Sequence, residues 1–218
     1  AKTNVVISGE KAGTGDKSAL TITTQAGTPS HRTDKYKFGS SSLNFDYQNF
    51  IKVDGGASGR FDFGSNNFTI DFWFNRDNFA PWGSIWELVN TEIGSSANNY
   101  VDILGRGDLD QYYYARVSSS NVTDQTSASG YDAQYSHNTW VHGVVQRYGT
   151  KFEYFTNGTR RFSHTMGSGS LDGLRYLYWG YGHNQVANGG DGAWDDIRIS
   201  DIARYTSSSY TVPTSRVT

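Results

Sequence analysis

The amino-acid sequence predicts an all-β protein built as an antiparallel sandwich of two sheets. Residues 68–76 alternate strictly, because Phe68, Ile70, Phe72 and Phe74 fall on one face and the residues between them on the other, as in a half-buried strand. The composition agrees: 25 Gly and 15% aromatic residues accompany only one Met and four Glu, so strand and turn formers outnumber helix formers. Roughly a dozen such short segments between turn signals are typical of a sandwich or barrel, and their number suggests two large sheets.

Further strands are expected wherever short apolar or alternating segments lie between turn signals. In chain order these strands span residues 4–7, 43–45, 50–53, 100–104, 111–117, 140–147, 151–156, 160–165, 176–180 and 193–199. Asn157-Gly158 is the preferred dipeptide of a type I′ hairpin turn. Leu177 and Trp179 are expected to point into the core. Residues 201–205 could form a helical turn.

The length and charge of the chain bound its function. The 218 residues suit one domain over 1–218, because all-β sandwiches can run past about 200 residues without dividing. The chain starts at Ala1 rather than Met, so we expect it to be processed or cut from something longer. The absence of Cys excludes a disulfide scaffold and a thiolate zinc site. A net charge of −2 argues against nucleic-acid binding by phosphate neutralisation, and no apolar run approaches the ~20 residues needed for membrane insertion.

Five motifs, in order, resemble the laminin G-like, concanavalin A-like jelly-roll domains. They lie at residues 38–46, 68–75, 140–158, 195–200 and 202–214. The resemblance covers nearly the whole chain and implies a single laminin G-like jelly-roll domain of two antiparallel sheets. The chain departs from the family pattern where Val141 and Gly143 replace the usual His and Val. Residues 202–214 are similar to the ending of copies of this domain in bacteriophage tail and virion proteins, which implies a virion-surface or extracellular location.

The resemblance also bears on catalysis. Related jelly-roll glucanases carry Glu-x-Asp-x-Glu on one strand, which sets their carboxylates on a common face, and glycoside cleavage normally needs such a pair. This triplet is absent from the chain, and Glu87 and Glu92 are offset by an odd number of residues, so a regular strand would turn them to opposite faces. No Gly-x-Ser-x-Gly elbow accompanies the five His residues. We therefore expect a protein that is not an enzyme.

A structural calcium ion is also implied by the resemblance. In many proteins of this fold the first Asp of the closing strand holds calcium, together with backbone carbonyls near the N-terminus. That residue is Asp195 here, with Asp196 beside it, and calcium prefers carboxylate and carbonyl oxygens. The alternative is that Asp195 faces solvent or caps a turn.

Aromatic residues on the outward phase of their strands predict a ligand-binding face. They are Trp73, Tyr112, Tyr114, Tyr176 and Tyr178, and the polar candidates for the same face are Asp71, Asn75, Asp102, Arg116 and His142. A flat ring beside polar groups suits the apolar C–H face and the hydroxyls of a sugar. A second candidate rim is formed by loop residues Trp82, Tyr131, Tyr181, His183 and Asn184. The alternative is that these aromatics pair across strands or are covered by a neighbouring subunit.

Together these features predict a non-enzymatic recognition module that binds cell-surface glycan or polysaccharide as part of a phage or virion adhesion protein. Binding at each site would be weak, and many copies would supply avidity. A structural capsid-decoration or tail-assembly domain that binds another virion protein is the alternative, and a glycan-degrading enzyme is a third hypothesis. The sandwich edges would permit a homo-oligomer. The sugar-binding prediction depends on an inward Phe68 and an outward, accessible Trp73.

Overall fold

The computed structural model describes residues 3–7, 12–13, 21–26, 30–46, 49–56, 59–77, 83–92, 100–106, 112–119, 122–126, 137–166, 169–180 and 191–216. These residues form sixteen β-strands and no helix, so nothing in this part of the chain resembles a membrane-spanning helix. The strands are β1 (Thr3–Ile7), β2 (Ala12–Gly13), β3 (Thr21–Ala26), β4 (Ser30–Arg32), β5 (Ser42–Phe45), β6 (Phe50–Asp54), β7 (Phe68–Arg76), β8 (Gly83–Val89), β9 (Tyr100–Arg106), β10 (Tyr112–Ser119), β11 (Val122–Thr126), β12 (Val141–Tyr148), β13 (Lys151–Thr156), β14 (Thr159–Thr165), β15 (Tyr176–Trp179) and β16 (Gly192–Ser200).

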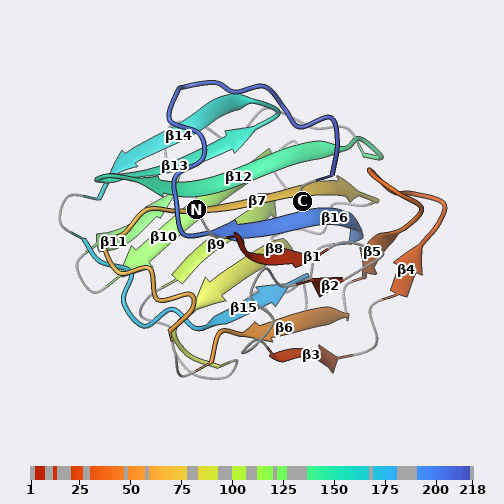
Figure 1. The fold of residues 1–218 in the computed structure, drawn as a ribbon, viewed down its shortest axis with the longest axis horizontal. Helices are drawn as coiled ribbons and strands as arrows, with labels where there is room; N and C mark the ends of the chain where they lie inside the picture. The colour runs from red at the N-terminus through yellow and green to blue at the C-terminus, as the bar shows by residue number, and fades with distance from the viewer. Residues whose placement is uncertain are drawn as a thin grey trace.

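The strands pair into two antiparallel sheets (Figure 1). The nine-stranded sheet has the order β14-β13-β12-β7-β16-β1-β2, and β5 joins it by pairing with β16 and β4. The seven-stranded sheet has the order β11-β10-β9-β8-β15-β6-β3. The predicted all-β, two-sheet sandwich is therefore confirmed.

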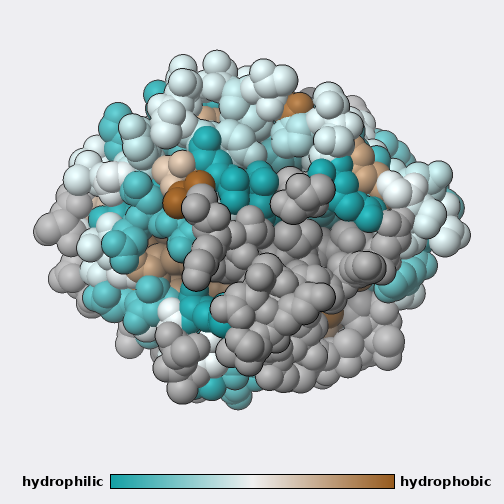
Figure 2. Space-filling model, in the orientation of Figure 1, coloured by the Kyte–Doolittle hydropathy of each residue, from teal (hydrophilic) through white to brown (hydrophobic). Residues whose placement is uncertain are grey.

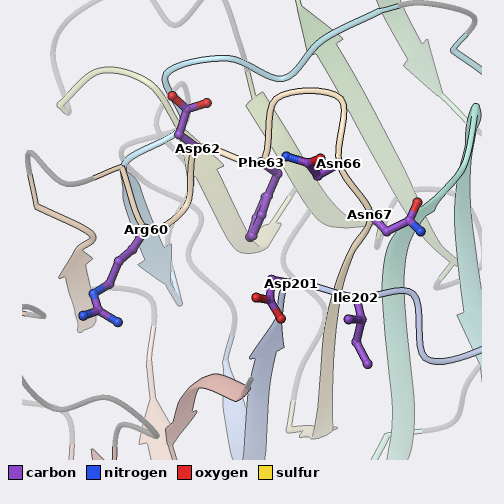
Figure 3. A pocket seen from close by; sticks show the side chains of 7 residues that line it. All are labelled: Arg60, Asp62, Phe63, Asn66, Asn67, Asp201 and Ile202. Carbon is purple, nitrogen blue, oxygen red and sulfur yellow. The ribbon is translucent and has the colours of Figure 1, made fainter. Parts of the chain in front are cut away.

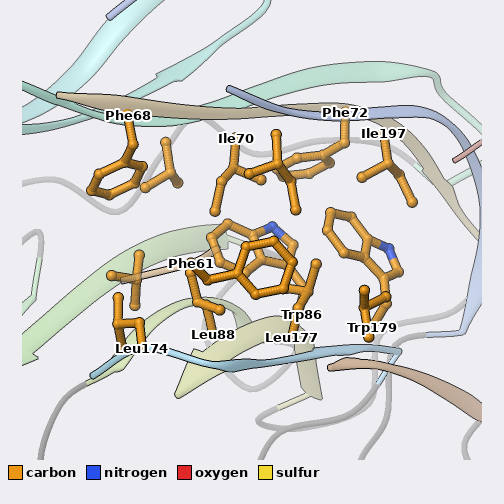
Figure 4. Packing of buried hydrophobic residues seen from close by; sticks show 14 of the residues in the cluster. Phe61, Phe68, Ile70, Phe72, Trp86, Leu88, Leu174, Leu177, Trp179 and Ile197 are labelled. Carbon is orange, nitrogen blue, oxygen red and sulfur yellow. The ribbon is translucent and has the colours of Figure 1, made fainter. Parts of the chain in front are cut away.

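The core fills the space between the two sheets (Figure 4). Phe68, Ile70, Phe72 and Phe74 of β7 are all fully buried, and in Figure 4 the labelled side chains of β7 face those of β8 and β15. Trp179 contacts the Phe72 ring edge to face, with the ring centroids 5.3 Å apart. The alternation of β7 therefore predicted the inward face correctly.

A β-bulge in β16 keeps two large residues inside the core. The register between β16 and β7 shifts between Asp195 and Arg198, and Asp196 adopts a φ of 52°. An extra residue in one strand resets its alternation, so Trp194 and Ile197 both stay fully buried.

The segment after β16, residues 201–216, runs across the outer face of the nine-stranded sheet (Figure 1). We call it the C-terminal strap. Its backbone is tied to the β13–β14 hairpin, because Arg160 N donates to Ser208 O at 2.9 Å and Tyr210 N donates to Gly158 O at 2.9 Å. Residues 201–205 form no helical turn, so that expectation is wrong.

Five strands were missed by the sequence analysis: β2, β3, β4, β8 and β11. The reason is clearest in β8, where the register with β9 shifts between Ser84 and Trp86. Such an irregularity interrupts the two-residue alternation by which a strand is recognised. The neighbouring prediction for β15 is confirmed, because Leu177 and Trp179 are fully buried.

Candidate functional site

The predicted ligand residues do not share one face. Trp73 lies on β7 of the nine-stranded sheet, whereas Tyr176 and Tyr178 lie on β15 of the seven-stranded sheet. Because the two sheets stack through the core, their outward faces lie on opposite sides of the sandwich. The prediction that all these aromatics share one face is therefore wrong.

Trp73 points away from the core, as predicted, but it is only 4% exposed. The Lys37 ammonium lies 3.9 Å from the centre of its ring, Phe38 meets it edge to face with centroids 5.9 Å apart, and the His142 ring lies 5.0 Å away. The expectation that Trp73 is available to a ligand is wrong, because the segment around Lys37 and Phe38 covers it.

The C-terminal strap buries the polar side chains beside Trp73. Asp71 accepts two short hydrogen bonds from Arg198, 3.0 Å from Nε to Oδ1 and 2.7 Å from Nη2 to Oδ2, and Tyr205 Oη donates to the same Oδ2 at 3.2 Å. Burial raises the pKa of Tyr205, so its hydroxyl keeps its proton. This face is consequently closed by the chain itself.

His142, another polar candidate for a sugar contact, also lies beneath the strap. Its Nδ1 is 2.6 Å from Tyr210 Oη. Burial, assisted by the positive charges of Arg198 and Lys37, lowers the pKa of His142 to about 3. His142 is therefore a neutral structural residue near pH 7.

Asp195 holds the segment that covers Trp73. Its Oδ2 accepts hydrogen bonds from the backbone amides of Lys37 at 3.1 Å and Phe38 at 3.0 Å, and its Oδ1 accepts one from Asp196 N at 2.9 Å. Burial raises the pKa of Asp195, against the effect of these amides.

These amides limit what Asp195 can offer a metal ion. Two donors occupy Oδ2, so a cation could use little more than the remaining lone pair of Oδ1. Asp196 is buried beside it, at the bulge. Among the described residues no group of three or more His, Asp or Glu side chains could hold a metal. The calcium site at Asp195 and Asp196 stays a prediction.

The outer face of the seven-stranded sheet carries a row of polar positions. The strand register links one residue from each strand into this row, namely Thr23, Lys52, Tyr178, Glu87, Asp102, Arg116 and Thr126. Directly opposed residues of antiparallel strands share a face. Because the strand neighbours Leu88 and Leu177 point into the core, the row occupies outward positions.

Tyr112, Tyr114 and Arg116 follow one another at two-residue steps along β10. Alternation therefore places all three on the same face as Tyr176 and Tyr178. Their side chains lie outside the described part of the structure, so their role as ligand contacts stays a prediction. Trp82, Tyr131, Tyr181, His183 and Asn184, the predicted loop rim, also lie outside the described residues.

Tyr176 lies at the centre of a cluster of opposite charges on this face. The Lys52 ammonium is 5.0 Å from the ring centre, and the Arg175 guanidinium carbon is 4.8 Å from it. Lys52 donates to Glu92 Oε1 at 2.6 Å, and Arg175 forms a two-pronged pair with Asp54 at 2.8 and 3.0 Å. We call Lys52, Asp54, Glu92, Arg175 and Tyr176 the Tyr176 cluster.

Three of the four charged side chains of the cluster reach solvent, whereas that of Lys52 is only 13% exposed. Arg175 and Asp54 keep 39% and 23% of their side chains exposed, and Glu92 keeps 57%. Hydrogen bonds from Arg175 lower the pKa of Asp54, so this carboxylate stays ionised near neutral pH. Tyr176 itself is largely buried, with 9% of its surface exposed, so the part of the cluster open to a ligand consists mainly of its charged groups.

Tyr178 differs from the prediction. It is only 1% exposed and meets Phe50 edge to face, with centroids 6.2 Å apart. The two rings belong to a small outer cluster with Val89, Tyr100 and Tyr176. The prediction of Tyr178 as an exposed sugar platform is wrong, because cross-strand packing covers its ring.

The structure also brings together two carboxylate residues that the sequence did not connect. Glu87 of β8 is the register partner of Asp102 of β9. They come from different strands, so no spacing along the chain could have indicated the pair. Glu87 is only 1% exposed, which closes its carboxylate to a substrate in this structure.

Figure 2 shows the surface of the strap side of the molecule. The coloured atoms are mostly hydrophilic, and the hydrophobic residues among them are scattered rather than joined into one patch. Exposed large hydrophobic residues of the described chain are Tyr36 and Tyr148. The described surface thus offers polar contacts more than an extended apolar interface.

A family model described as the concanavalin A-like lectin/glucanases superfamily matches residues 46–207. No curated protein matches the chain. Among solved structures, domain 4 of AbnA, an extracellular arabinanase from Geobacillus stearothermophilus in complex with arabinotriose, superposes with a TM-score of 0.68 at 17% identity, over 93% of this chain and 94% of that one.

Toxin binding domains have the same fold. The binding domain of Paraclostridial Mosquitocidal Protein 1 gives a TM-score of 0.68 at 13% identity and covers 94% of this chain and 50% of that one. The binding domain of botulinum neurotoxin DC in complex with SialylT superposes with a TM-score of 0.63 at 9% identity, over 94% of this chain and 49% of that one. The chain thus spans about half the length of these toxin domains.

Proposed function

Because the chain belongs to the concanavalin A-like lectin/glucanase superfamily, we propose that it is a non-enzymatic glycan-binding module whose ligand lies on the outer face of the seven-stranded sheet. The observation that carries this proposal is the Tyr176 cluster, in which solvent-exposed groups of both charges surround a largely buried aromatic ring. The C-terminal strap closes the opposite face around Asp71 and His142, whereas the Tyr176 cluster keeps charged side chains in solvent.

The chemistry of the cluster suits sugar hydroxyls. A hydroxyl both donates and accepts hydrogen bonds, so it can donate to Asp54 or Glu92 and accept from Arg175 or Lys52 without leaving a charge unsatisfied. The exposed part of the Tyr176 side chain is available for contact with the sugar. The cluster contains two cations and two carboxylates, so it favours neither an anionic nor a cationic ligand.

Two of the similar structures were solved with glycan ligands, arabinotriose for the arabinanase domain and SialylT for the neurotoxin domain. Another neurotoxin binding domain was solved with a protein, rat synaptotagmin II. These complexes support a binding role and make a protein partner the alternative outcome of the test below. Few-contact sugar sites bind in the micromolar to millimolar range, about −8 to −4 kcal/mol, so repeated copies would supply useful avidity.

The test is a glycan array followed by titration calorimetry with the polysaccharide that binds best. Tyr176→Ala and Arg175→Ala should each weaken binding about tenfold or more, the equivalent of about 1.4 kcal/mol. Tyr148→Ala is the matched control, because Tyr148 is an exposed aromatic residue, 42% accessible, on the other sheet. Unchanged affinity in both cluster variants would place the ligand elsewhere, and capture of a protein with no bound glycan would favour the structural-domain hypothesis.

We further propose that the module acts on a virion surface, as part of a phage tail or adhesion protein. This setting is supported by the resemblance of residues 202–214 to the ending of such domains. Mass spectrometry of purified phage particles should detect the chain in the assembled virion. Its presence only in secreted cellular protein would replace the virion setting with an extracellular one.

Hydrolysis is a second candidate, favoured by one observation. Glu87 and Asp102 are opposed in the register, which places two acidic residues on one face of neighbouring strands, and glycosidases normally use a pair of carboxylates. The burial of Glu87 argues against it. Release of reducing ends that is abolished by Glu87→Gln would establish hydrolysis, and binding without any product supports the non-enzymatic proposal.

A further inference from the structure

A pocket of about 500 Å³ opens where β7 begins and β16 ends (Figure 3). Its walls come from two segments far apart in sequence, the connection between β6 and β7 and the start of the C-terminal strap. The lining residues are Arg60, Asp62, Phe63, Asn66, Asn67, Asp201 and Ile202. The volume falls within the range of about 300–1,000 Å³ that is typical of small-molecule sites.

Several of these residues are held in place by contacts outside the pocket. Asn67 Oδ1 accepts a hydrogen bond from Gly149 N at 2.8 Å, and Asp62 Oδ1 accepts one from Gly173 N at 2.9 Å. Phe63 stacks on Phe68, with centroids 4.5 Å apart. The wall is therefore formed before a ligand arrives, which lowers the entropic cost of binding.

The strap side of the pocket is fixed as well. Ile202 O accepts a hydrogen bond from Thr69 Oγ1 at 2.7 Å, so the segment that carries Asp201 and Ile202 is attached to β7. Across the pocket, Gly64 O accepts from Leu171 N at 2.9 Å. The strap wall is consequently tied to β7, and the other wall to the segment that precedes β15.

Two polar groups at the rim remain available to a ligand. The side chains of Asn66 and Asp201 are exposed, and no hydrogen bond joins either one to another residue in the described ranges. Asn67 uses its oxygen for Gly149 and keeps two amide N–H donors. The pocket thus presents an acceptor carboxylate and amide donors within one hollow.

We propose that this pocket binds a neutral saccharide unit. An anionic ligand would be opposed by the carboxylates of Asp62 and Asp201, whereas sugar hydroxyls can donate to a carboxylate and accept from the side-chain amides of Asn66 and Asn67. Phe63 and Ile202 supply the apolar contact that a sugar ring also needs. This mixture of groups is carried by residues that the sequence analysis did not single out.

The ligand class rests on the proposed glycan-binding function, but the site is separate from the Tyr176 cluster. The pocket is built by the connection after β6 and by the strap, whereas the cluster lies mainly on β6 and β15. A module with both sites would contact a polysaccharide at two places, and two linked weak sites bind more tightly than either one alone.

The experiment is a ¹⁵N NMR titration of the full chain with arabinotriose and cellotriose as neutral probes. Trigalacturonate and a glucosamine trimer are the anionic and cationic comparisons. We expect the neutral probes to shift the side-chain amide signals of Asn66 and Asn67. Asn66→Ala combined with Asp201→Asn should weaken the response of the remaining Asn67 amide at least fivefold, while Ser207→Ala, an exposed substitution on the same strap, should leave it unchanged.

The result separates the two proposals. Shifts at Asn66 and Asn67 that persist in Tyr176→Ala confirm the pocket independently of the cluster. Shifts confined to the Tyr176 cluster would support the proposed function and overturn the pocket. A pocket that responds to trigalacturonate or the glucosamine trimer more strongly than to the neutral probes would overturn the neutral-saccharide inference.

Discussion

His142 makes the stability of the strap-covered face depend on pH. In the folded chain the pKa of His142 is lowered to about 3 by burial, with further repulsion from Arg198 and Lys37. In the unfolded chain a histidine titrates near 6.5. Below pH 6.5 the unfolded chain therefore binds a proton that the folded chain does not bind. The stabilisation is fully present above pH 6.5 and is lost as the pH falls toward 3.

The size of the loss follows from these two values. A pH of 4.5 is about two units below the pKa of the histidine in the unfolded chain, so that histidine is protonated, whereas the folded one is still neutral. Since each unit corresponds to about 1.4 kcal/mol, His142 should lower the free energy of unfolding by about 2.5 kcal/mol between pH 7.5 and 4.5. The substitution His142→Gln removes the titrating group and keeps a partner for Tyr210 Oη.

Urea unfolding at both pH values provides the assay, with stability taken from the midpoint and slope. Between pH 7.5 and 4.5 the free energy of unfolding of the unsubstituted chain should fall by about 2.5 kcal/mol more than that of His142→Gln, whatever the absolute stability of the variant. Equal losses would refute the reasoning, because they would mean that His142 is protonated in the folded chain and that the strap does not bury it.

Three further predictions concern the packing around the two faces. Gly143→Ala should lower the free energy of unfolding by about 1–3 kcal/mol in urea melts, because its new Cβ would lie 2.6 Å from the buried ring of Phe72; an unchanged midpoint would contradict this packing. Trp73→Ala should lower the free energy of unfolding by about 3–5 kcal/mol and leave the glycan affinity measured by calorimetry unchanged. Weaker binding by the variant, compared at an equal fraction of folded protein, would show that Trp73 contacts the ligand after all. Asp195→Asn should lower the free energy of unfolding by about 1–3 kcal/mol, because it replaces one of the two carboxylate oxygens that accept hydrogen bonds from three backbone amides. The loss should be equal in EDTA and in calcium. Thermal stabilisation by calcium that only the unsubstituted chain shows would instead assign a calcium ion to Asp195.

The sequence predicted the inside of the sandwich better than its surface. Alternation in β7 identified its buried face, because the burial of a hydrophobic row fixes which residues point inward. Gly143, a departure from the family pattern, also has a reason in the core: it leaves space for the Phe72 ring. These features depend on one strand and its immediate neighbour, which local sequence patterns can express.

The candidate site was harder to predict for two physical reasons. Alternation shows that Trp73 and Tyr176 point outward, but it does not show that they belong to different sheets. Nor does it show that a remote segment will cover a face, as the strap does through Tyr205 and Tyr210. One usable signal was present, because a segment after the last strand that carries aromatic residues and Pro213 is a candidate to pack back on the domain.

Crystallography of the chain with its best-binding oligosaccharide would show directly which side of the sandwich meets the glycan. We predict saccharide density beside Tyr176, with sugar hydroxyls hydrogen-bonded to Arg175 and Asp54. Density on the nine-stranded sheet, with the strap displaced and Trp73 stacked on the sugar, would contradict it.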